Sequence, residues 1–299
     1  MEISPTAVRD LRAETGVGMM ECKKALVEAG GDFEEARKIL RKKGLAVAAS
    51  KAGRATTEGL VLAHVRPQAA VLVEVNCETD FVARTEAFRA FAEKLAERIA
   101  THDAFGETRS GAGAGVEGLT WPTEPTVAVA LAQLVATLKE NIQIRRFVRL
   151  VPGPGEKFGS YVHGNGRIGV LVGIASGDDE LRRDLAMHVA ASDPRFASRA
   201  EVTPEILATE REIARAQAAQ AGKPANVVER IADGKVEKFY QESVLTEQAF
   251  VKEPEKTVGQ ILVERGGRGA LDLRFARYKL GESLGRAVEP DVPAARAGA

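Results

Sequence analysis

Cys77 is the residue whose side chain could act as a nucleophile, with His64 or His163 as its general base. Such catalysis requires a thiol within hydrogen-bond reach of an imidazole, and donors that stabilise the developing oxyanion. The sequence beside Cys77 contains no oxyanion-type loop, and the residue follows a strand-like segment. We therefore expect a buried thiol at the end of a strand, and a Cys77-based hydrolase is the less favoured alternative.

The other residues that could bind a metal or a nucleotide lack the necessary spacing. The four histidines lie in different segments: His64, His102, His163 and His188. Cys22 and Cys77 are too far apart in sequence for a zinc site or a redox pair, and both are expected to be reduced, half-buried thiols. Gly164 and Gly166 flank a hairpin signal and precede no helix N-terminus, so a turn is favoured over a phosphate loop. We expect no metal and no cofactor, which favours an interaction protein over an enzyme.

Two adjacent methionines, Met19 and Met20, follow a glycine-containing loop where a helix is expected to begin. Adjacent residues on a helix cannot both face one core, so one of the two should be exposed. Flexible thioethers are favoured at protein-binding surfaces, which makes this pair a candidate binding site. The alternative is that one methionine packs against the other helices while its neighbour covers the following linker.

A second informative stretch carries Phe81 next to Asp80 in a polar loop. One interpretation makes Thr79 or Asp80 a helix N-cap and Phe81 its buried hydrophobic contact. The other makes Phe81 a wedge, an exposed ring that inserts into a partner protein while Asp80 binds a cationic or amide group there. Spacing alone leaves both open. Full burial of such a side chain contributes about 1.5–3 kcal/mol.

The segments that must position these residues are read from hydrophobic periodicity and cap signals. Expected helices cover residues 4–15, 19–29, 32–43, 86–100, 127–142, 179–191, 203–220, 226–242 and 257–265. Expected strands cover residues 60–65, 71–75, 144–151, 160–163, 168–174 and 271–280. Asp32 and Glu35 are expected to form a capping box. Two similar halves of β-hairpin plus helix form a weak internal repeat, and the sequence predicts an α+β fold.

The chain divides by composition into a compact N-terminal three-helix module and a larger core. The predicted divisions are residues 1–54 for the module, 55–143 and 144–285 for two core subdomains, and 286–299 for a disordered tail. Residues 44–55 are expected to be a basic, mobile linker, and residues 102–125 a surface loop. A helical hairpin at about residues 203–242 belongs to the second subdomain.

Composition excludes several classes of protein. Lys plus Arg and Asp plus Glu both number 42, and this zero net charge argues against non-specific nucleic-acid binding. Aromatic residues make up only 5%, too few for extended base-stacking platforms. No window approaches 18 consecutive apolar residues, and no signal peptide is evident, so residence in the cytoplasm is the default expectation.

The stretches around Met19 and Phe81 resemble the two signature segments of the bacterial elongation factor Ts family. Further similar segments are residues 140–146, 159–163, 167–172, 186–192 and 256–260. The resemblance extends from residue 1 to about residue 285. Departures are Glu78, where the family commonly has Gln, Arg84, where Lys is frequent, and the unpatterned residues 102–125.

The resemblance implies a guanine-nucleotide exchange factor that acts on elongation factor Tu by binding, without covalent chemistry. It also implies an N-terminal ubiquitin-associated-like module, two similar core subdomains with small antiparallel sheets, a helical hairpin and a C-terminal docking module. The candidate site is then the loop that intrudes near the partner's magnesium and nucleotide: Asp80, Phe81, Val82 and Ala83. Further partner-binding candidates are Arg12, Met19, Met20, Thr79 and His163.

The resemblance implies that the partner is bound in both its GDP-bound and its nucleotide-free states. We expect no direct contact with nucleic acid and none with a membrane. A homodimer that would give a 2:2 complex is left open. The alternative function is a non-catalytic adaptor or scaffold, in which residues 1–54 alone would bind a peptide or a ubiquitin-like partner.

Overall fold

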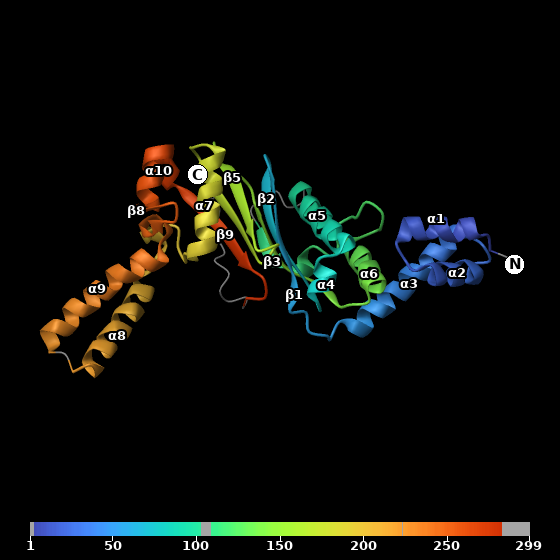
Figure 1. The fold of residues 1–299 in the computed structure, drawn as a ribbon, viewed down its shortest axis with the longest axis horizontal. Coiled ribbons are helices and arrows are strands. Elements are labelled where there is room, and N and C mark those ends of the chain that lie inside the picture. Colours follow the sequence, from blue (N-terminus) through green and yellow to red (C-terminus); the bar gives the residue numbers. More distant parts are fainter. Residues whose placement is uncertain (1–2, 103–108, 223, 283–299) are drawn as a thin grey trace, which may run out of the picture. The chain divides into compact units, whose positions relative to one another are not determined.

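The fold is taken from a computed structural model that describes residues 3–102, 109–222 and 224–282 (Figure 1). These residues form two compact units. The first unit comprises the described residues up to Val151 together with Asn165–Arg167 and Lys279–Glu282. The second unit comprises Pro152–Gly164 and Ile168–Tyr278. The domain divisions that the sequence predicts stay predictions, and the predicted tail lies outside the described residues.

The first unit begins with three short helices around a small apolar core. They are α1 (Pro5–Thr15), α2 (Met19–Glu28) and α3 (Phe33–Lys51). Ser4 caps α1 by accepting a hydrogen bond from the Ala7 amide, and Pro5 occupies the first turn. Asp32 caps α3 by accepting from the Glu35 amide. The predicted capping box also requires the Glu35 side chain to accept from the Asp32 amide, and this bond is absent among the described contacts, because the Glu35 carboxylate pairs with Lys38 instead.

Both cysteines, predicted to be half-buried, are fully buried.

The predicted mobile linker over residues 44–55 is wrong for residues 44–51, because α3 continues to Lys51. Gly44 lies where α3 meets the later helix α6 (Val127–Leu138), and a β-carbon there would come within 3.2 Å of the Gln133 side chain. The glycine therefore permits close helix packing instead of ending the helix. Only a short turn after Lys51 separates α3 from the sheet.

A four-stranded antiparallel sheet forms the core of the first unit, in the order β1-β2-β4-β3. The strands are β1 (Glu58–Arg66), β2 (Ala69–Cys77), β3 (Arg109–Ala112) and β4 (Ile142–Leu150). Two helices pack on its apolar face: α5 (Glu86–Thr101) and α6 (Val127–Leu138). Every residue of β2 is buried, as expected for an inner strand between two neighbours.

Two details of this sheet differ from the sequence-based expectation. Part of the predicted loop 102–125 forms β3, which pairs with β4 at the sheet edge, followed by a short 3-10 helix (Gly113–Gly115). Ile142, predicted to lie on a helical face with Leu138, instead begins β4, because Lys139 adopts a left-handed conformation that ends α6.

The second unit contains a three-stranded sheet in the order β5-β6-β9. Its elements are β5 (Lys157–His163), β6 (Ile168–Ile174), α7 (Asp179–Ser192), β7 (Ala249–Phe250), β8 (Glu253–Thr257), α10 (Val258–Gly266) and β9 (Leu273–Lys279). Asn165 and Gly166 both have positive φ, which confirms the hairpin predicted between β5 and β6. The small β7-β8 hairpin was not predicted. The α+β fold class is confirmed.

The predicted helical hairpin is also confirmed, as α8 (Pro204–Gln220) beside α9 (Ala225–Ser243) (Figure 1). Arg199 holds its base together, because its guanidinium pairs with Glu237 of α9 and with Glu247 beyond it. The same guanidinium lies 4.1 Å from the ring centre of Tyr240.

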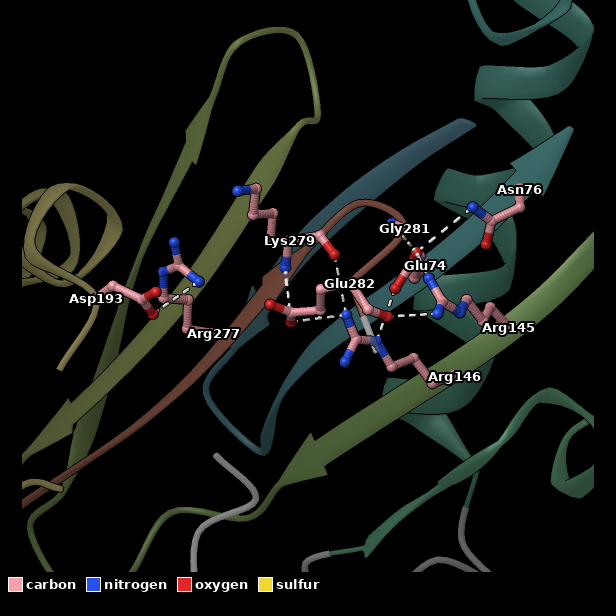
Figure 2. A network of polar contacts seen from close by, with 9 residues as sticks. All are labelled: Glu74, Asn76, Arg145, Arg146, Asp193, Arg277, Lys279, Gly281 and Glu282. Carbon is pink, nitrogen blue, oxygen red and sulfur yellow. Dashed lines mark hydrogen bonds and ion pairs between the residues drawn. The ribbon is translucent and has the colours of Figure 1, made fainter. Parts of the chain in front are cut away.

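A buried cluster of ion pairs surrounds Glu74 of β2 in the first unit (Figure 2). The Glu74 carboxylate lies 2.9 Å from an Arg145 nitrogen and 2.7 Å from Arg146 Nε, both on the neighbouring strand β4. It also accepts the backbone N–H of Gly281 at 2.8 Å, while Arg146 pairs with Glu282 at 2.9 Å. This cluster attaches residues 279–282, late in the chain, to the central strands of the first unit.

Candidate functional site

The Phe81 loop is a single helical turn, α4 (Asp80–Ala83), placed directly after β2 and before α5. Thr79 is its N-cap, and the Thr79 hydroxyl accepts a hydrogen bond from the Val82 amide at 3.4 Å. A second threonine, Thr85, caps the following helix by accepting from the Phe88 amide. Two capped helix starts six residues apart explain why the chain turns sharply here.

The two apolar residues at the end of α4 are buried, whereas the ring of Phe81 is not. Val82 and Ala83 are buried in the core of the first unit, whereas Phe81 is 80% exposed. The interpretation of Phe81 as a buried capping contact is therefore wrong, although the N-cap at Thr79 that it assumed is present. Water contact over most of a phenyl ring is unfavourable, so this ring is available for burial against another molecule.

Asp80 is half-buried and already has a partner within the chain. Its carboxylate lies 2.7 Å from the Arg84 guanidinium, one helical turn further on. Arg84 is largely exposed, so the pair is in contact with solvent and contributes little to stability. A partner group could therefore replace Arg84 at small cost.

Two residues just before β4, Glu140 and Asn141, hold the α4 turn, and sequence reasoning missed their role. Glu140 accepts the Thr79 hydroxyl proton at 2.6 Å and the Thr79 and Glu78 amide protons at 3.0 and 3.1 Å. The backbone N–H of Asn141 donates to the Glu78 carboxylate at 2.6 Å, and this hydrogen bond is the main cause of the lowered pKa of Glu78. More than sixty residues separate these partners, so no local pattern signals the contact.

The methionine pair is more exposed than predicted. Met19 is 44% and Met20 64% exposed, because both stand in the first turn of α2, beyond the buried stripe that begins at Cys22. Arg12 is exposed in the last turn of α1. The three residues belong to the three-helix module and thus to the first unit, which also carries α4.

His163 belongs to the second unit, at the end of β5. It is exposed, and its Nδ1 lies 3.2 Å from the Tyr161 hydroxyl on the same face of the strand. The rings of these two residues stack with centres 6.1 Å apart. Val162, on the other face of the strand, is also exposed.

Cys77 cannot act as a nucleophile with His64. Cys77 pairs across the hairpin with Glu58, whereas His64 pairs with Val71, six positions along β2 and therefore roughly 20 Å away. The Cys77 thiol is buried and donates to the Thr79 carbonyl oxygen at 3.1 Å. Burial, with the nearby Glu140 carboxylate, raises its pKa to about 12, so the thiol stays protonated at neutral pH. The prediction of a buried thiol at the end of a strand is confirmed.

Within residues 3–102, 109–222 and 224–282, no three His, Cys, Asp or Glu side chains are grouped so that they could hold a metal ion. None of the helices in this described part of the chain combines the length and apolar character needed to cross a membrane. What the described surface does offer is an exposed ring on a short turn that is held in place by hydrogen bonds.

Comparison with known proteins gives the family. The family model for elongation factor Ts matches residues 78–282, a range that includes α4 and Glu140. Elongation factor Ts of Thioalkalivibrio sulfidiphilus is 45% identical over 293 residues, which cover 97% of this chain and 96% of the relative. That of Aquifex aeolicus is 43% identical over 290 residues, covering 94% and 99%. That of Clostridium botulinum is 41% identical over 300 residues, covering 96% of each. The chain belongs to the elongation factor Ts family, and its role is that of a translation elongation factor.

Proposed function

We propose that this chain binds elongation factor Tu in its GDP-bound and nucleotide-free states and promotes exchange of GDP for GTP. The observation that carries the proposal is the exposure of Phe81 on a turn whose other apolar residues, Val82 and Ala83, are buried. The turn enters the partner near its magnesium and nucleotide, and Phe81 displaces partner elements there. Asp80 exchanges Arg84 for a cationic or amide group of the partner.

Exchange by this route needs no proton transfer and no covalent intermediate. A factor that binds the nucleotide-free partner more tightly than the GDP-bound partner must weaken GDP binding by the same ratio. A thousandfold weakening corresponds to roughly 4 kcal/mol. Burial of the Phe81 ring in the partner supplies about 1.5–3 kcal/mol of this. Disturbance of the partner's magnesium site supplies the rest.

The remaining candidate residues enlarge the contact. Arg12, Met19 and Met20 bind the partner's GTPase domain through the three-helix module, and their exposure supports this role. Thr79 belongs to the turn that enters the partner. His163, on the second unit, contacts another domain of the partner.

The test follows release of fluorescent GDP from bacterial elongation factor Tu by stopped flow, in the presence of saturating unlabelled GDP. The intact chain should accelerate release strongly, and Phe81→Ala should lose most of the acceleration. Val65→Ala is the matched control, because Val65 is another exposed apolar residue of the first unit that lies outside α4. This control should behave like the intact chain.

Two outcomes would count against the proposal. If the intact chain leaves GDP release unchanged, the exchange function is wrong, and the adaptor alternative becomes the one to test, with residues 1–54 as bait. If the chain accelerates release but Phe81→Ala does so equally well, exchange stands and the wedge role of Phe81 is wrong.

A further inference from the structure

We propose that Glu140 is the positioning residue of the exchange site, because it fixes the direction in which α4 presents Phe81. This inference rests on the proposed exchange function and adds a residue that lies outside the loop itself. Glu140 stands at the junction of α6 and β4, next to Lys139, whose positive φ turns the chain back toward the end of β2.

Within the described residues, the Glu140 carboxylate accepts three hydrogen bonds, all from the loop that precedes α4. One oxygen, Oε2, accepts both backbone amides, of Glu78 at 3.1 Å and of Thr79 at 3.0 Å. The other oxygen, Oε1, accepts the hydroxyl proton of Thr79 at 2.6 Å. Hydrogen bonds to an ionised carboxylate are stronger than those between neutral groups, and three on one side chain fix the loop in both position and orientation.

The hydroxyl bond has a specific consequence for α4. A threonine hydroxyl can donate one hydrogen bond, and that of Thr79 donates to Glu140. The lone pairs of the Thr79 oxygen are then directed toward the Val82 amide. Glu140 thereby orients the N-cap of the turn that carries Phe81. A four-residue helical turn has too few internal hydrogen bonds to hold its own shape, so it depends on this cap.

The same junction also holds the chain segment that leads out of the three-helix module. Asn141 is buried, and its side-chain amide donates to the carbonyl oxygens of Arg54 at 2.7 Å and Ala52 at 3.3 Å. Glu78, whose amide is bound by Glu140, accepts from the Arg54 guanidinium at 3.4 Å. One polar cluster of Glu78, Glu140 and Asn141 thus holds both the Phe81 turn and the segment that follows α3.

The test measures GDP release from elongation factor Tu against the concentration of the full chain, for intact protein, Glu140→Ala, Phe81→Ala and the double variant. Glu140→Ala should lower the maximal release rate about tenfold, which corresponds to about 1.4 kcal/mol. The concentration that gives half the maximal rate should change little, because the three-helix module is intact. The double variant should be no slower than Phe81→Ala, because Glu140 acts through Phe81.

Two further variants separate positioning from a loss of folding. Glu140→Gln keeps an oxygen for the two amides but loses the acceptor for the Thr79 hydroxyl, so its rate should lie between those of the intact chain and Glu140→Ala. Glu97→Ala removes a carboxylate that pairs with Arg66 elsewhere in the first unit, and should leave exchange unchanged. Thermal unfolding of each variant shows whether the fold persists.

The inference is overturned if Glu140→Ala, folded, exchanges as fast as the intact chain while Phe81→Ala is slow. It is equally overturned if the Glu140 and Phe81 effects multiply in the double variant, since Glu140 would then act independently of the ring. Failure of the exchange function itself gives a different pattern, in which the intact chain does not accelerate GDP release at all.

Discussion

His188 accepts the backbone N–H of Val251 at Nδ1, 3.3 Å away, and this contact fixes the protonation state of the imidazole. Nδ1 must carry a lone pair, so the proton is on Nε2, which donates to Gln248 Oε1 at 2.9 Å. The Gln248 amide nitrogen in turn donates to the carbonyl oxygens of Ser192 and Glu242. A neutral, fully buried histidine therefore joins the end of α7, the end of α9 and the β7-β8 hairpin.

The first prediction concerns the pH dependence of folding through His188. Burial lowers the pKa of His188 below its ordinary value of about 6.5. Between the folded and the unfolded pKa, the unfolded chain binds a proton at His188 that the folded chain does not. The stability that neutral His188 contributes is therefore complete above about pH 6.5. It decreases as the pH falls below that value, until the lower pKa of the folded state is reached. Urea unfolding of the intact chain at pH 7.5 and 5.5 measures this loss.

His188→Asn is the comparison for that measurement. Asparagine keeps an acceptor for the Val251 amide but does not titrate. The variant should be less stable at pH 7.5 and should lose less stability between pH 7.5 and 5.5, by as much as about 1.4 kcal/mol per pH unit. Equal pH dependence in the two proteins would contradict the assignment of a neutral His188.

The second prediction separates the two phenylalanines near α4. Phe81 is exposed whereas Phe88 is completely buried. Phe81→Ala should change the free energy of unfolding by less than about 0.5 kcal/mol, and Phe88→Ala should cost about 3–5 kcal/mol. Urea titrations monitored by circular dichroism measure both. A large destabilisation by Phe81→Ala would mean that the ring packs within the chain.

The third prediction concerns the two cysteines, both buried and free. Burial raises the pKa of each thiol, that of Cys77 to about 12, and excludes reagents from the sulfur. An aromatic disulfide reagent at pH 7.5 should therefore react with neither cysteine in the native protein and with both in urea. Rapid modification of native Cys77 would revive the hydrolase alternative.

The fourth prediction concerns the buried cluster around Glu74. Glu74→Ala leaves the buried Arg146 without its nearest carboxylate and should cost about 3–5 kcal/mol of unfolding free energy. Glu229→Ala is the matched control, because Glu229 pairs with Arg215 on the exposed surface of the helical hairpin. That loss should be below about 1 kcal/mol. Similar small losses for both variants would show that the cluster is not a significant source of stability.

Much of the secondary structure follows from local patterns in the sequence. The spacing of Phe88, Phe91 and Leu95 places α5 correctly, and these residues are buried together against the sheet. The strand β3 lacks such a pattern, because the sequence of residues 109–112 contains no large apolar residue, although this segment pairs with β4. Strands of this kind are specified by their neighbour and not by their own residues.

At the candidate site, too, local sequence patterns do not reveal contacts between distant residues. Phe81 could be singled out by its type and its neighbours, but its exposure follows from the packing of Val82 and Ala83 in the core. Glu140 could not be singled out, because the contact that gives it a role joins residues 61 positions apart. The end of the third helix was wrongly predicted before Gly44 for a related reason. A glycine that ends a helix cannot be told in sequence from one that lets a second helix pack closely.

The attachment of Gly281 to Glu74 links residues 207 positions apart, and it sets an order on events during synthesis of the chain. The amide of Gly281 does not exist until another 207 residues have been added after Glu74, which takes roughly 10–40 s. During that interval, the Glu74 carboxylate in the central sheet of the first unit lacks one of its hydrogen-bond donors. A nascent chain that stalls before residue 281 has both strands and can pair Glu74 with Arg145 and Arg146, but it lacks the Gly281 donor that completes the cluster.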